Sequence, residues 1–85
     1  MSQEKLLRLG KLCQLEEEKK ALSARARAGL YVLRGVFSDV ELLLDPSRFV
    51  DLDLEMIKAV IQDLQSVQKK YREVISHIKE IKEDL

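Results

Sequence analysis

The chain has 85 residues, and its 15 basic and 15 acidic side chains cancel to a formal net charge of zero. This length is typical of a single domain, and the charge balance argues against a protein that coats nucleic acid through a strong net positive charge. A single cysteine excludes an internal disulfide, so a reducing compartment, the cytoplasm, is the expected location. Apolar residues make up 46% of the chain and aromatic residues only 5%, which suits packed helices.

Membrane insertion and secretion are not indicated by the sequence. The first eleven residues, MSQEKLLRLGK, lack the apolar core of a signal peptide. No apolar run elsewhere approaches the roughly 20 residues that a transmembrane helix needs. We therefore expect no membrane partner.

The N-terminal half carries an apolar stripe whose members recur in alternating steps of three and four, the spacing of one helix face. The stripe comprises Leu12, Leu15, Leu22, Ala26, Gly29, Leu33, Val36, Val40 and Leu43, and Lys19 interrupts it. A second row beside it comprises Leu30, Phe37 and Leu44. This pattern predicts one long amphipathic helix over about residues 3–44.

Three glycines are candidate positions for a break in that helix. An internal glycine destabilises a helix by about 1 kcal/mol relative to alanine. A break at Gly10 would leave a short separate helix at the N-terminus, and Gly35 lies off the stripe. Gly29 lies on the stripe, where its missing side chain would let another backbone approach closely.

The segment at about residues 45–52 predicts a turn. Pro46, the only proline, disfavours a helical conformation of Asp45 before it, which favours a helix end there. The same pair suits the N-cap and first position of one short helical turn. Asp51 or Asp53 is then expected to cap the second helix, because a short acidic side chain can accept hydrogen bonds from its first amides.

The C-terminal part, about residues 53–85, predicts a second long helix with three rows of apolar residues at seven-residue spacing. The first row is Leu54, Ile61 and Ile75, the second is Ile57, Leu64, Tyr71, Ile78 and Leu85, and the third is Val60, Val67, Val74 and Ile81. Three rows form a face wide enough for more than one neighbouring helix.

Together these patterns predict an all-α fold, a single long antiparallel helical hairpin. With the turn centred near residues 48 and 49, Leu85 would lie opposite Leu12, and the first eleven residues would overhang. The third row and the overhang would remain exposed, which favours assembly into a four-helix bundle or a higher oligomer, with a dimer as first choice. The candidate interface residues are Leu6, Leu9, Val60, Val67, Val74 and Ile81.

This register would also gather basic side chains at mid-length of the rod and acidic ones at its turn. The basic cluster, which we call the waist, comprises Arg25, Arg27, Arg34, Lys69, Lys70 and Arg72. Arginine forks suit phosphate, so the waist is a candidate site for a nucleotide, a nucleic acid or an acidic protein surface. The alternative is a solvated face with charge pairs along each helix. Only Tyr31 lies near the waist to stack on a base, which weakens the nucleic-acid interpretation.

Catalytic, cofactor and metal motifs are not found in the sequence. His77, the only histidine, has no companions at metal-ligand spacing, and Cys13 is expected to pack beside Leu12 as a small apolar residue. The expected function is therefore a non-enzymatic protein–protein interaction module, an adaptor, inhibitor or assembly subunit that acts through self-association. Small helical proteins of this kind are common products of phages and mobile elements. An anion-binding module that uses the waist is the alternative.

Overall fold

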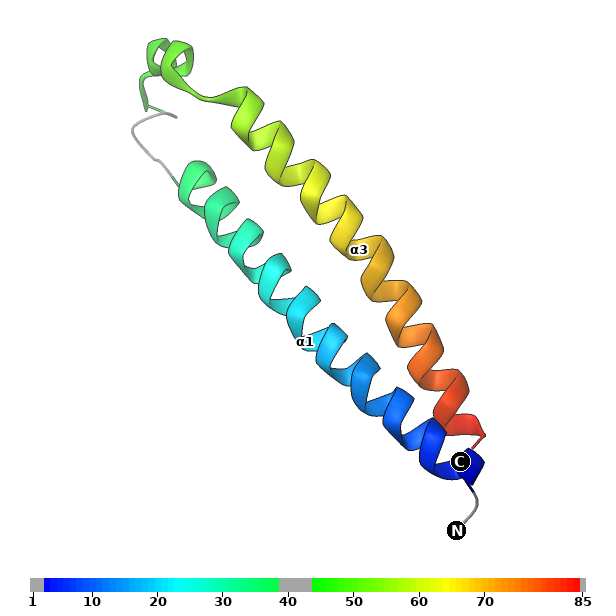
Figure 1. Cartoon of the computed structure of the whole chain (residues 1–85). Coiled ribbons are helices and arrows are strands. Elements are labelled where there is room, and N and C mark those ends of the chain that lie inside the picture. Colours follow the sequence, from blue (N-terminus) through cyan, green and yellow to red (C-terminus); the bar gives the residue numbers. More distant parts are fainter. Residues whose placement is uncertain (1–2, 39–43, 85) are drawn as a thin grey trace.

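The chain folds back on itself as two long antiparallel helices in a computed structural model, which describes residues 3–38 and 44–84 (Figure 1). Helix α1 spans Gln3–Phe37, a 3-10 helix, η1, spans Pro46–Asp51, and helix α3 spans Leu54–Glu83. The described residues contain no strand. The molecule is a rod of 67 × 18 × 16 Å. The predicted all-α helical hairpin is confirmed.

Helix α1 ends at Phe37, earlier than the predicted end at residue 44. Ser38 follows, and both its backbone N–H and its hydroxyl donate to the carbonyl of Arg34. A hydroxyl that bonds the carbonyl four residues back competes with the regular helix and favours a bend or an end. The rest of the predicted extension falls on residues 39–43, which lie outside the described residues.

The turn is built by its aspartates, as expected. Asp45 is the N-cap of η1, and its carboxylate accepts hydrogen bonds from the backbone N–H and the hydroxyl of Ser47. Pro46 occupies the start of this helix, where an N–H would have no helical partner. Asp53 caps α3 by accepting a hydrogen bond from the backbone N–H of Met56, at 2.9 Å. Of the two predicted caps of the second helix, Asp53 is therefore the one used.

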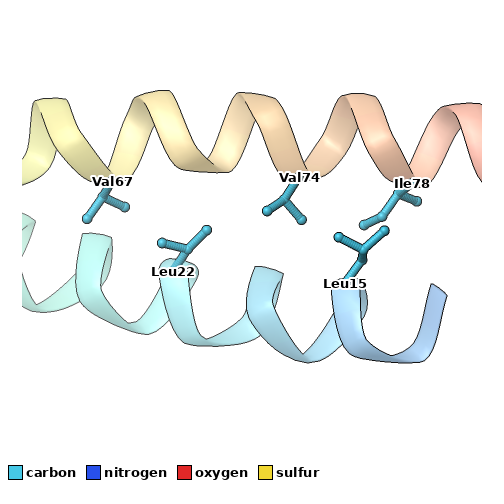
Figure 2. Packing of buried hydrophobic residues seen from close by; sticks show 5 residues of the cluster. All are labelled: Leu15, Leu22, Val67, Val74 and Ile78. Carbon is cyan, nitrogen blue, oxygen red and sulfur yellow. The ribbon is translucent and has the colours of Figure 1, made fainter. Parts of the chain in front are cut away.

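The core is a narrow seam along the line where the two helices meet. Side chains from both helices point toward one another there (Figure 2). The buried cluster comprises Leu15, Leu22, Val67, Val74 and Ile78. On α3 the seam follows the second and third seven-residue rows, and on α1 it follows the predicted stripe. The first row of α3 takes no part in this seam, which decides where apolar surface is left exposed.

Helix α1 runs without interruption through all three glycines, so the separate N-terminal helix allowed for at Gly10 is wrong. Tertiary packing along the seam outweighs the weak helix propensity of single glycines. Gly29 does permit a close approach, but of a side chain and not of a backbone. A Cβ atom at Gly29 would lie 2.9 Å from Cδ2 of Leu64.

Replacing the two unhindered glycines should stabilise the hairpin. A Cβ atom added at Gly10 or at Gly35 meets no other atom within 4 Å. Gly10→Ala and Gly35→Ala should therefore each raise the free energy of unfolding by about 0.5–1 kcal/mol. Gly29→Ala should gain less, because Leu64 must shift. Urea denaturation measures the free energy of unfolding of the three variants. Equal gains at all three positions would contradict the close packing of Leu64 on Gly29.

The helices are displaced by about one helical turn from the predicted register. The prediction set Gln68 opposite Gly29, whereas Leu64 lies there. The predicted overhang of the first eleven residues is too long, because Arg8 donates a hydrogen bond to the backbone carbonyl of Asp84 at 3.3 Å. The start of α1 therefore packs beside the end of α3. The difference arises because the fold-back is centred earlier than residues 48 and 49.

Candidate interaction groove

An open groove of about 930 Å³ runs between α1 and α3 near the middle of the rod. Its apolar and aromatic lining residues are Ala26, Leu30, Tyr31, Ile61, Leu64, Val67 and Tyr71. Its polar lining residues are Ser23, Arg27, Arg34, Gln65, Gln68 and Arg72. The groove thus combines an apolar floor with three guanidinium groups, an arrangement suited to an occupant that is both apolar and anionic.

Helical spacing explains why these residues share one side of the hairpin. On α1, Ser23, Arg27 and Leu30 follow one another in steps of four and three, beside the buried stripe. On α3, Ile61, Gln65 and Gln68 repeat those steps beside the seam. Residues spaced in this way lie above one another on a helix surface. The two strips flank the seam on the same side of the molecule, which we call the groove side.

The opposite side of the seam is bridged by an ion pair. Arg25 donates a hydrogen bond from Nη2 to Oδ1 of Asp63 at 2.5 Å. Arg25 precedes the seam residue Ala26, whereas Arg27 follows it, so the two arginines diverge to opposite sides of α1. The predicted register, centred near residues 48 and 49, would set Arg25 opposite Arg72; this is wrong, because the register is shifted and Arg25 faces an acid instead.

The structure separates the predicted waist into two groups. Arg27, Arg34 and Arg72 line the groove together. Lys69 and Lys70 are exposed and do not line it. The sequence thus predicted the correct position of the basic cluster along the rod. Half of the waist residues nevertheless point away from the groove, because a count of charges along a helix does not show toward which side of the helix each side chain points.

The candidate interface row on α3 lies partly inside the hairpin. Val67 and Val74 are only 2% and 4% exposed, and both belong to the core. Val60 is half-buried, and Ile81 packs against the core cluster. This placement corrects the expectation of an exposed strip, because the neighbouring helix covers the third row and not the first. Leu6 and Leu9, on the start of α1, are exposed as expected.

The exposed apolar rows instead lie on the groove side. Ile61 lines the groove and is 41% exposed, and seven-residue spacing places Leu54 and Ile75 on the same side of α3, at 49% and 43% exposed. On α1, Leu30 lines the groove, and Phe37 follows it seven residues later. These two side chains are 58% and 71% exposed. The groove side therefore exposes apolar side chains of both helices that no part of the hairpin within residues 3–38 and 44–84 covers.

Side chains outside the groove are placed as follows. Cys13 is exposed and not packed against the seam, which corrects that expectation. Glu16 approaches Lys82 of the other helix at 3.9 Å, and Lys20 pairs with Glu17 at 3.7 Å. Within residues 3–38 and 44–84, no three His, Cys, Asp or Glu side chains lie together as a metal site would require.

Tyr71 is one of the groove residues that the sequence patterns did not assign to a binding site. It was assigned to the core row, and it does pack against the core cluster. It also lines the groove, as Tyr31 does, so two phenol groups and three guanidinium groups belong to the same lining. Its position at the edge of the seam, next to Arg72, was the available signal in the sequence.

Neither long helix, as far as the structure describes them, has a stretch apolar enough to cross a membrane. Comparison with known proteins finds no matching family model, no matching curated protein and no matching solved structure. The molecule's own geometry is therefore the basis for the function proposed next.

Proposed function

We propose that this protein is a non-enzymatic protein–protein interaction module that acts by self-association through the groove side. One observation carries the proposal: the exposed apolar rows of both helices lie on the same side of the hairpin. An adaptor, an inhibitor or an assembly subunit are the roles that fit such a module. The cytoplasm is the compartment that fits it, since a chain with one cysteine forms no internal disulfide.

Solvent exposure of this face is unfavourable for an isolated hairpin. Monomers rarely expose large contiguous apolar patches, and such patches usually mark interaction sites. Burying a large aliphatic or aromatic side chain contributes about 1.5–3 kcal/mol relative to leaving it exposed. Two hairpins that meet through their groove sides would form a four-helix bundle with two-fold symmetry and would extend the heptad packing to a second pair of helices.

A matched pair of substitutions tests which side of the hairpin associates. Ile61 on the groove side and Val32 near the bridged side are both 41% exposed, and each lies within a long helix. Ile61→Asp places a charge in the proposed interface and should weaken self-association at least tenfold, because it removes an apolar contact and puts in its place a carboxylate that must be desolvated. Val32→Asp introduces the same charge on the other side and should leave self-association within about twofold of the wild type.

Analytical ultracentrifugation over a range of concentrations gives the dissociation constants, and circular dichroism shows that both variants remain helical. Equal weakening by the two substitutions would contradict a one-sided interface. No weakening by either one would place the association surface elsewhere.

A second candidate function is binding of a phosphate-bearing ligand in the groove. It is favoured by the presence of Arg27, Arg34 and Arg72, together with Tyr31 and Tyr71, in the lining of one groove. A guanidinium group can donate two parallel hydrogen bonds to the oxygens of one phosphate, and phenol rings can stack on bases. Fluorescence titration with a labelled oligonucleotide distinguishes this function, because phosphate binding weakens steeply with salt. Saturable binding that is lost in Arg72→Glu would favour it over self-association.

A further inference from the structure

We propose that the groove receives the tip of a second copy of this chain, where the tip is the described segment 44–56. The inference rests on the proposed self-association and specifies its contacts. The occupant suited to the groove, which is both anionic and apolar, is then a segment of the protein itself. It also gives a single explanation for the two charge clusters, one at the turn and one at mid-length of the rod.

The charge of the groove has one sign. Three arginines line it, and among the residues that the structure describes no acidic side chain does. Guanidinium groups form paired hydrogen bonds with carboxylates, and fixed like charges repel a cationic segment. The groove therefore selects an acidic partner.

The tip has the opposite charge and an apolar surface. Its acidic residues are Asp45, Asp51, Asp53 and Glu55, against the single base Arg48. Asp45 and Asp53 also cap helices, so their backbone hydrogen bonds hold these two carboxylates in fixed positions at the turn. Phe49, Val50 and Leu54 are 55%, 83% and 49% exposed. The tip thus offers apolar side chains for the floor of the groove and carboxylates for its arginines.

The distance between the tip and the groove within one chain allows two copies to place their tips in each other's grooves at the same time. Leu54, at the base of the tip, lies on the groove side, and Gln65 lines the groove farther along the same helix. At 1.5 Å per residue these positions are about 17 Å apart along α3. When two copies run in opposite directions with their groove sides facing, each tip reaches the other copy's groove. Such a reciprocal contact closes a two-fold dimer, in which the same pair of surfaces meets twice.

Paramagnetic NMR between copies tests this contact directly. In a Cys13→Ser background, Val50→Cys carries a spin label on unlabelled protein, which is mixed with isotope-labelled wild-type chain. Only a contact between copies can then broaden the observed amide signals. The expected result is strong broadening at Gln65, Gln68 and Ala26. A control label on Glu18→Cys, in the exposed part of α1 away from the tip, should leave these amides sharp.

The outcomes separate this inference from the proposed function. Sedimentation of the same mixtures reports self-association independently of the label. A mass above that of one chain, with broadening confined to residues outside the groove, would overturn tip docking and leave self-association standing. The mass of one chain at all concentrations, without broadening, would overturn both.

A charge exchange supplies the complementary test. Arg72→Glu should weaken self-association at least tenfold, whereas Lys70→Glu, whose residue is exposed outside the groove, should change it less than twofold. The double variant Asp51→Lys, Glu55→Lys should also associate weakly alone, but it should bind Arg72→Glu at least fivefold more tightly than either variant binds itself. Failure of the mixture to regain affinity would overturn the proposed pairing of the tip with the groove.

Discussion

Val67→Asp is expected to abolish the helical fold at room temperature. Val67 is the most buried core residue, at 2% exposed, and its side chain points from α3 toward α1 beside Leu22 (Figure 2). The substitution removes about 1.5–3 kcal/mol of apolar burial and adds the penalty of burying an unpaired carboxylate, several kcal/mol more. Small domains have a total stability of only about 5–15 kcal/mol, and a two-helix seam lies at the low end.

Circular dichroism at 222 nm measures the loss of helix. The adjacent substitution Ser66→Asp is the matched control, because Ser66 is exposed and the introduced charge is the same. Ser66→Asp should retain the wild-type signal. A Val67→Asp variant that keeps its helicity but loses self-association would place Val67 in an interface between copies and not in the hairpin core.

Leu22→Ala is expected to produce the second largest loss of stability, about 2–5 kcal/mol, as truncation of a buried leucine leaves a cavity. Leu22 is 5% exposed and faces Val67 and Val74 across the seam (Figure 2). Leu30→Ala removes the same atoms from a side chain that is 58% exposed. In dilute samples that contain mainly single chains, Leu30→Ala should change the free energy of unfolding by less than about 0.5 kcal/mol.

Urea denaturation of both leucine variants at two protein concentrations separates the contributions of the core and of assembly. At high concentration Leu30→Ala should become destabilising, because association stabilises the folded state by mass action and Leu30 lies in the proposed interface. Equal losses for the two variants in dilute samples would contradict the described burial of the seam.

The helices and the caps could be read from the sequence because their causes are local. Steps of three and four mark the stripe through Leu15 and Leu22, and Asp51 and Asp53 are the two candidate caps before the second helix, of which the structure uses Asp53. Each of these signals lies within one or two helical turns. They required no knowledge of how the two helices are rotated against each other.

The exposed face could not be read in the same way. All three rows of α3 carry apolar residues at seven-residue spacing, and the only sequence signal that separates them is that Gln68 and Lys82 interrupt the first row. The structure places Val67 and Val74 inside and leaves Ile61 and Ile75 outside, because the seam needs two adjacent rows and α1 packs over the second and third. A shift of one turn in register also moved Arg25 from Arg72 to Asp63. The rotation of each helix and the register between α1 and α3 are set by the packing of the two helices together, so local sequence patterns do not predict them.

Sedimentation equilibrium of the wild-type protein tests self-association most directly. At micromolar concentrations the account predicts an average mass above the 9.8 kDa of a single chain, falling toward that value on dilution. The fall should occur without loss of helicity if the hairpin core folds on its own. A mass of 9.8 kDa at every concentration from micromolar to millimolar would contradict the account.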